Sequence, residues 1–413
     1  MISDVTLPAM KDKRLLIIFL TVFIDLVGFG IIIPMNPYLA KAYGATPFQV
    51  GILGGVYSLM QFIFAPIWGQ LSDKYGRRPI IILSLFGAGI AHLGFGFASN
   101  LIGLMLARGF AGMFGGNLPA AMAYIADITE AKDRSKSMGI IGAAFGLGFV
   151  LGPAIGGVAT HFGMMLGSAP PLGGSFPALV AAAICIVNGL FAIRFLPESH
   201  LHRSHTQSDF SHSIRWKKLW ICLTKPTLST VMVVSFLSAF GLAHIEQNLF
   251  LLMHEKFGWT QIQASFGFVY LGLIMVLTQG YLIRKWMPKY GERNLMLMGL
   301  MLACVGILLV GNVANIWVVA VGVTSLGFGN SMANPSINGS ISLLSHKDEQ
   351  GNNLGVAQSL SSMARILGPP TGGFLFGLAV PAPFFVGAAA TFIGFLLAWR
   401  VRQHLPMVGY GRT

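Results

Sequence analysis

Long apolar stretches alternate with short polar turns along most of the chain. Residues 48–68 and 80–98 contain no Asp, Glu, Lys or Arg, whereas the turn between them, GQLSDKYGRRP, carries four charged side chains. An apolar run of about 18 residues or more can cross a bilayer core of roughly 30 Å as an α-helix. Backbone groups in lipid must pair within their own segment, which favours helices. The pattern therefore predicts membrane-spanning helices joined by polar turns.

The same criterion gives twelve expected spans. They cover residues 15–35, 48–68, 80–98, 101–126, 138–159, 177–196, 228–252, 264–283, 296–312, 316–336, 356–378 and 383–399. The first apolar run is too long for a cleaved signal peptide, and no small-residue cleavage site follows it. We therefore expect an all-α integral membrane protein with twelve transmembrane helices.

Composition and charge placement agree with a membrane protein. The chain is 54% hydrophobic and only 10% charged, whereas soluble domains carry about 25% charged residues. With the N-terminus placed inside, the inner segments hold 23 of the 27 Lys and Arg residues, and the outer loops hold only Lys41 and Lys256. Basic residues favour cytoplasmic loops. The net charge of +13 therefore indicates topology rather than nucleic-acid binding, and we expect both termini on the cytoplasmic side of a cell's inner membrane.

The sequence contains an internal repeat. KYGRRP at 74–79 recurs as KYGERN at 289–294, and GPAIGG at 152–157 recurs as GPPTGG at 368–373. The two KYG motifs are 215 residues apart, and the two GP motifs are 216 apart, as are Pro119 and Pro335. Repeats of this kind are typical of transporters built from two similar halves. We expect two pseudo-symmetric six-helix bundles, residues 1–199 and 226–413, joined by a basic cytoplasmic linker at 200–225.

Three motifs resemble those of the major facilitator superfamily. GQLSDKYGRRP resembles its loop signature, RGFAGMFGG at 108–116 is similar to a fourth-span motif of proton-coupled members, and GLGFVLGPAIGG at 146–157 resembles the fifth-span motif of drug exporters. Residues 57–88 are similar to tetracycline and multidrug efflux proteins. The resemblance implies two bundles that rock around a midplane cavity and export small molecules in exchange for protons. The fifth-span positions are Gly148, Gly152, Pro153, Gly156 and Gly157.

The charged turn is expected to form a conformational latch, which also follows the family. Asp73 would lie at the N-terminus of the eleventh span, near Gly355, where the helix dipole attracts an anion, and Arg77 would pair with Asp127. The alternative is that this turn only signals topology, although Asp contributes little to that rule. The expected latch residues are Gly69, Asp73, Gly76, Arg77, Arg78 and Asp127.

Ionisable residues inside spans are costly and are treated as functional by default. Asp25 lies about ten residues into the first span, and the resemblance implies that it carries the proton. The alternative is a structural ion pair with Arg108, and the two roles are compatible. Asp25 and Arg108 are therefore candidate cavity residues.

Glu246 and Arg365 are the candidates of the second half. Glu246 is expected either as a second proton or substrate site or as a residue at the outer membrane surface. Arg365 is expected either to bind an anionic group or to extend toward the membrane surface. His92 and His244 are expected to be packed or interfacial side chains.

The sequence contains no metal-ligand cluster, Walker-type phosphate loop or enzyme-like constellation, so we expect neither an enzyme nor a cofactor. The expected function is proton-coupled export of amphipathic small molecules by a monomer in the bilayer. The alternatives are uptake by symport and export of one metabolite such as a siderophore. Tetracycline exporters that resemble this chain carry acidic residues at positions that align with Ala91 and Ala303. A metal–tetracycline chelate is therefore not the expected substrate.

Overall fold

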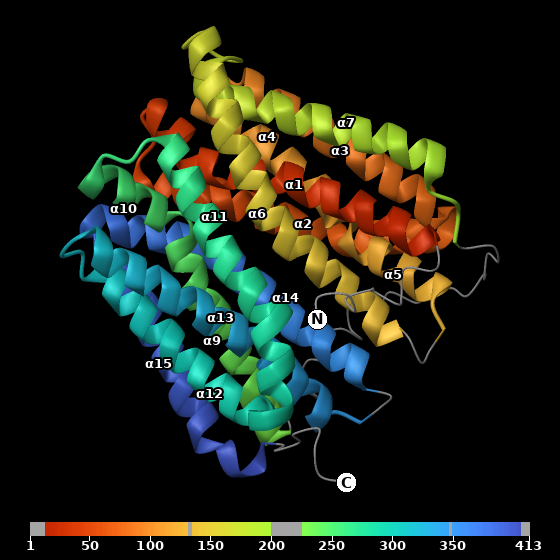
Figure 1. The fold of residues 1–413 in the computed structure, drawn as a ribbon, viewed down its shortest axis with the longest axis vertical. Helices are drawn as coiled ribbons and strands as arrows, with labels where there is room; N and C mark the ends of the chain where they lie inside the picture. Colours follow the sequence, from red (N-terminus) through yellow and green to blue (C-terminus); the bar gives the residue numbers. More distant parts are fainter. Residues whose placement is uncertain (1–12, 131–133, 200–224, 347–348, 406–413) are drawn as a thin grey trace, which may run out of the picture. The chain divides into compact units, whose positions relative to one another are not determined.

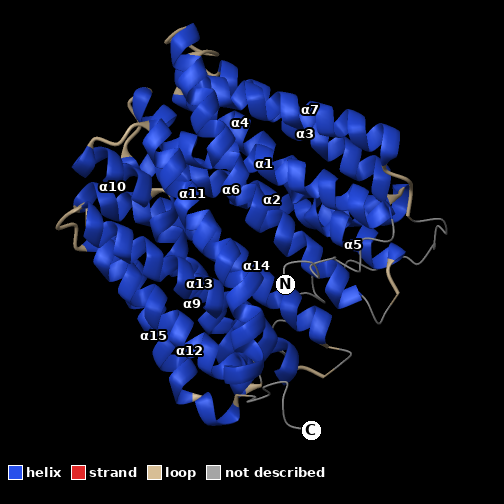
Figure 2. Cartoon of the chain, viewed as in Figure 1, coloured by secondary structure: helices blue, strands red, loops and turns tan. Residues whose placement is uncertain are grey.

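The computed structural model describes residues 13–130, 134–199, 225–346 and 349–405, and every regular element in these ranges is a helix (Figure 2). The expected linker lies outside the described residues, apart from Lys225. Ten helical segments in these ranges are long and apolar enough to cross a membrane, which confirms the all-α membrane architecture. The helices are α1 Lys13–Ala42, α2 Pro47–Tyr75, α3 Arg77–Phe97, α4 Leu101–Phe114, α5 Leu118–Ile128, α6 Arg134–Leu166, α7 Phe176–Phe195, α9 Pro226–Glu246, α10 Asn248–Phe257, α11 Gln261–Leu277, α12 Ile283–Gly311, α13 Ile316–Leu344, α14 Gln350–Leu378 and α15 Ala382–Arg400.

The ten segments differ from the twelve expected spans at two places. The eighth and ninth expected spans follow one another without a loop in the helical run Gln261–Gly311, in which α11 and α12 are joined by a π-helical turn, η4 Thr278–Leu282, and two helices meet at a kink within α12. This run changes direction at Gly291, whose φ is 72°. The eleventh expected span lies in α14, which is a long helix but is not among the ten; its first half is rich in Gln, Asn and Ser, and its second half contains Arg365, Pro369 and Pro370.

The fourth span is interrupted where the sequence leads us to expect one helix. A short 3₁₀ turn, η2 Gly115–Asn117, separates α4 from α5. Pro119 follows directly, and a proline has no backbone N–H to bond the carbonyl four residues earlier. The Gln61 side chain donates to that carbonyl, Gly115 O, at 2.9 Å. A side chain of α2 therefore bonds the carbonyl that Pro119 leaves without its usual backbone donor at this break.

The described residues form two compact units, each combining one half of the sequence with a short piece of the other. The first contains 13–43, 59–199 and 260–270, and the second contains 44–58, 225–259 and 271–405. In the first unit α1 packs along α6, and α3 along α7 (Figure 1). At the start of α11, Gln261 donates hydrogen bonds to Thr160 Oγ1 and Gly174 O, both at 3.1 Å. These bonds, together with the packing of Phe268 against Phe149, join residues 260–270 to the first unit.

The repeated KYG turns share an unusual backbone conformation. Gly76 has a φ of 104° and Gly291 a φ of 72°. Residues other than glycine rarely adopt positive φ values. Arg77 and Glu292 follow these glycines, and both are buried, at 8% exposure. The two turns are therefore alike in backbone but opposite in the charge of the next residue.

Candidate functional site

Asp25 lies near the middle of α1 and accepts a side-chain hydrogen bond from Asn117 in η2. Its side chain is half-buried. A buried carboxylate is costly unless hydrogen bonds offset its lost hydration, so Asn117 lowers the cost of keeping Asp25 in the span. The sequence prediction did not include Asn117. The sequence feature that could have indicated Asn117 is an uncharged amide within an apolar span, two residues before Pro119.

Two further ionisable side chains are buried in the spans of the same unit. Arg108 on α4 is buried, at 3% exposure, and its Cζ lies 5.9 Å from the ring centre of Phe29. Phe29 is one helical turn after Asp25, on the same face of α1. His92 on α3 is also buried and interacts electrostatically with Arg108. The spans of the first unit therefore hold Asp25, Arg108 and His92 on three helices, with Arg108 interacting with His92 and with Phe29, and an Asp25–Arg108 ion pair stays a prediction.

The second unit holds a smaller charged cluster. Arg365 on α14 interacts electrostatically with Glu246 and with Tyr57, and Arg365 Nη2 donates to Ser362 Oγ at 3.3 Å. Glu246 is the last residue of α9, at the break before α10. It therefore lies within the span Pro226–Phe257. Tyr57 was not predicted, because a tyrosine in an apolar run carries no distinguishing sequence signal.

His244 lies one turn before the α9–α10 break and is fully buried. Its Nδ1 lies 2.9 Å from Phe240 O, and its Nε2 lies 3.2 Å from Thr371 Oγ1. Both ring nitrogens therefore have a polar neighbour within the second unit. This placement corresponds to the packed side chain that the sequence led us to expect.

Arg77 is the centre of the charged turn in the first unit. Its Nη1 lies 2.6 Å from Asp73 Oδ1, and its Nε lies 3.2 Å from Asp127 Oδ2. Nη1 also donates to Ser72 Oγ at 2.6 Å. The turn is therefore tied to the end of α5 through Asp127, as the sequence analysis expected. The expected contact of Asp73 with Gly355 would join the two units, and it stays a prediction.

Glu198 completes this network and was missed at the level of sequence. Its carboxylate accepts the backbone N–H groups of Arg77, at 2.9 Å, and Arg78, at 3.3 Å. These are the first residues of α3, so a carboxylate occupies the positive end of the helix dipole. Ser199 Oγ donates to Asp127 Oδ2 at 3.1 Å. The chain segment after α7 therefore anchors the charged turn.

The fifth-span glycines lie where α6 packs against other helices. A Cβ atom on Gly152 would lie 2.7 Å from Val27 O and 2.8 Å from Gly30 Cα, both on α1. A Cβ atom on Gly157 would lie 3.2 Å from the Cβ of Ser265 on α11. Small residues allow membrane helices to approach this closely. The motif is therefore a packing surface in this structure.

The chain belongs to the Major Facilitator Superfamily, whose family model matches residues 18–289 and 281–409. It is 31% identical to the class B tetracycline resistance protein of Escherichia coli over 362 residues, which cover 87% of each chain. It is 28% identical to multidrug resistance protein 2 of Bacillus subtilis, covering 95% of this chain and 97% of that protein. The protein is therefore a multi-pass membrane transporter of small molecules and not an enzyme.

Solved structures agree on the fold. The human organic anion transporter MFSD10 (TETRAN) matches with a TM-score of 0.71 and 24% identity, covering 94% of this chain and 99% of that one. At this identity the likeness concerns the architecture alone.

Proposed function

We propose that the protein exports amphipathic small organic molecules from the cytoplasm in exchange for protons. The observation that carries the proposal is Asp25: a half-buried carboxylate in mid-span, hydrogen-bonded by Asn117, on the helix whose Phe29 lies under the buried Arg108 guanidinium. The names of the tetracycline and multidrug resistance relatives support it.

A single carboxylate is enough to couple the proton gradient to transport. A gradient of about 180 mV provides roughly 4 kcal/mol per charge, or about a thousandfold in concentration. This work is available only when a group gains and loses its proton in step with the conformational change. Asp25 is the proposed coupling group, and Glu246 beside Arg365 is a proposed second site in the other unit.

The proposed substrate is amphipathic and is not a metal–tetracycline chelate. The aligned positions at which tetracycline exporters carry acidic side chains hold Ala91 and Ala303, which are 2% and 5% exposed. A cationic chelate needs a counter-charge in a low-dielectric site. With Asp25 as the main acidic group of the first unit's cluster, lipophilic drugs and dyes fit the proposal better.

We propose an inner-membrane location, both termini in the cytoplasm, and a monomer whose sequence halves, 1–199 and 226–413, form the two rocking bundles. The Arg77 network acts as the cytoplasmic latch. Cysteine labelling of intact cells tests this topology. A cysteine at exposed Lys256 is expected to react with an impermeant reagent, and one at Arg194 is expected to stay unreacted.

Everted membrane vesicles test the direction and coupling of transport. With the lumen acidified, adding a lipophilic dye that the protein confers resistance to is expected to release protons and drive dye into the lumen. The control is the same vesicles without the protein. Proton movement in the same direction as the dye would contradict exchange and indicate symport.

A further inference from the structure

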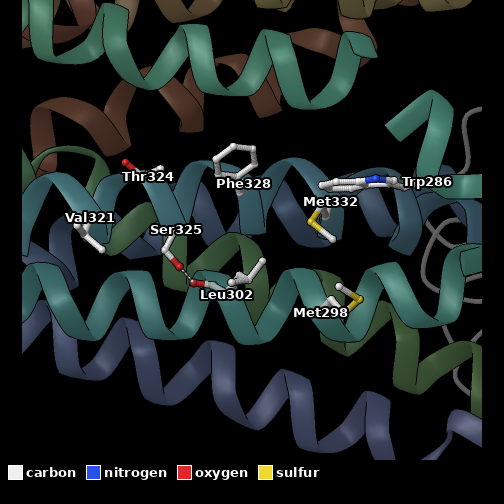
Figure 3. Close-up of a pocket in the computed structure, with 8 residues that line it drawn as sticks. All are labelled: Trp286, Met298, Leu302, Val321, Thr324, Ser325, Phe328 and Met332. Carbon is white, nitrogen blue, oxygen red and sulfur yellow. Dashed lines mark hydrogen bonds between the residues drawn. The ribbon is translucent and has the colours of Figure 1, made fainter. Parts of the chain in front are cut away.

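A groove of about 460 Å³ runs between α12 and α13 in the second unit (Figure 3). It is separate from the charged clusters described above, because none of their residues forms its wall. The principal wall residues are Trp286, Met298, Leu302, Val321, Phe328 and Met332.

The wall is suited to hydrocarbon. Two hydroxyl groups also line it, but Ser325 donates to Leu302 O at 2.8 Å, drawn as a dashed line in Figure 3, and Thr324 donates to Ala320 O at 2.6 Å. Both hydroxyls therefore already have a backbone carbonyl as acceptor. Apart from the indole N–H of Trp286, the remaining side chains of the wall are aliphatic, thioether and aromatic groups, which gain little from a polar occupant.

The groove lies open on the surface of apolar membrane-spanning helices. Val321 is 60% exposed, Met298 48% and Leu302 37%. From Val321 to Met332 the wall follows α13 for eleven residues, about 16 Å at 1.5 Å per residue. Half of the bilayer's hydrocarbon core is about 15 Å thick. The groove therefore has the length of one lipid leaflet.

Three exposed basic residues lie within one helical turn of Trp286, at one end of the groove. Trp286 lies there beside Met332 (Figure 3), and tryptophan is enriched at the boundary between hydrocarbon and headgroups. Arg284 and Lys285 directly precede it in the chain, and both are exposed. Lys289, one turn further on, is also exposed and lies over the Tyr290 ring at 5.2 Å. This end therefore complements an anionic headgroup.

We propose that this groove binds an anionic phospholipid, with one acyl chain between α12 and α13 and the phosphate headgroup on Arg284 and Lys285. A juxtamembrane Lys or Arg contributes about fivefold to the binding of an anionic lipid. Two such residues give a preference of about 25-fold over a neutral lipid with the same chains. This site does not depend on the direction of transport or on the nature of the exported molecule.

The test uses the full-length protein in phosphatidylcholine nanodiscs doped with a lipid whose acyl chains are brominated, because bromine quenches tryptophan fluorescence on contact. The contribution of Trp286 is the difference between wild type and Trp286→Phe. Half-maximal quenching is expected at a mole fraction of brominated phosphatidylglycerol about 25-fold lower than that of brominated phosphatidylcholine. Half-maximal quenching at equal mole fractions of the two lipids, or no quenching assignable to Trp286, would overturn the proposal.

Two variants separate the headgroup from the chain. The double change Arg284→Gln with Lys285→Gln is expected to bring the half-maximal mole fractions of the two lipids together, whereas the control Arg194→Gln, which removes one exposed basic residue on α7 of the first unit, keeps the preference. Val321→Phe narrows the far end of the groove and is expected to weaken the binding of both lipids equally.

Native mass spectrometry of the wild-type protein requires no variant. It is expected to retain phosphatidylglycerol in preference to phosphatidylcholine when both are supplied at equal concentration. Retention of both lipids to the same extent would contradict the site.

Discussion

Replacing Gly152 by alanine tests how tightly the fifth-span motif holds α6 against α1. The added methyl group would lie 2.7 Å from Val27 O and 2.8 Å from Gly30 Cα. Ordinary van der Waals contacts begin near 3.4 Å, so one helix must move by several tenths of an ångström. The neighbours are backbone atoms, which cannot rotate away. Overpacking of this kind costs about 1–3 kcal/mol.

Gly142 provides the matched control because it lies on the same helix and a Cβ atom there would have no neighbour within 4 Å. Alanine is favoured over glycine in a helix by about 1 kcal/mol, and this gain applies to both variants. The difference between Gly152→Ala and Gly142→Ala therefore isolates the cost of the contact, about 1–3 kcal/mol.

Thermal unfolding of the purified variants, followed by circular dichroism, measures this difference. About 2–4 °C is expected per kcal/mol for a unit of 150–250 residues, with Gly152→Ala unfolding at the lower temperature. Passive proton leak through liposomes containing each variant provides a second measurement, and it is expected to rise for Gly152→Ala alone. Equal unfolding temperatures and equal leaks would refute the argument that this glycine sets the distance between α1 and α6.

Three further predictions concern the charged ends of the helices. Asp73→Asn is expected to slow transport without abolishing substrate binding, because it removes one partner of Arg77, and an inward–outward equilibrium unchanged in distance-label measurements would rule out the latch. Glu198→Gln is expected to destabilise the protein by about 1 kcal/mol, since it removes the charge at the N-terminus of α3, and an unaltered unfolding temperature at low salt would count against this role. The Lys225 ammonium, 2.6 Å from the Glu349 carboxylate, lowers the pKa of that carboxyl below its usual value. The ion pair therefore stabilises the folded protein above about pH 4.3, and this stabilisation is lost as the pH falls through the lowered pKa. Glu349→Gln should therefore lower the unfolding temperature at neutral pH and match wild type in acid, and an equal difference at both pH values would contradict the pairing.

Hydrophobic periodicity predicted the membrane-spanning character of the helices because lipid imposes a long, uninterrupted apolar pattern. It could not predict the break between α4 and α5, where Gln61 from a different helix supplies the hydrogen bond that Pro119 cannot. Nor could it predict that residues 44–58 pack with the second unit. Both depend on contacts between residues far apart in the sequence.

The candidate site was predictable where charge interrupts an apolar pattern, as at Asp25 and Arg108. Asn117 and Tyr57 were missed because an uncharged polar side chain in a span is common and does not stand out. Glu198 was missed for another reason: it lies at the end of a span among polar residues, where a charge is expected in any case. Only the bonds to the backbone of Arg77 and Arg78 distinguish it from an ordinary surface glutamate.

Uphill transport by the Asp25→Asn variant is the most direct test of the proposed coupling. The variant keeps the size of the side chain and an oxygen that can accept a hydrogen bond from Asn117, but it cannot gain and lose a proton. In liposomes with an imposed proton gradient, it is expected to fail to concentrate a dye that wild type concentrates, while dye binding and downhill dye movement persist. Uphill accumulation equal to that of wild type would contradict the assignment of Asp25 as the coupling carboxylate.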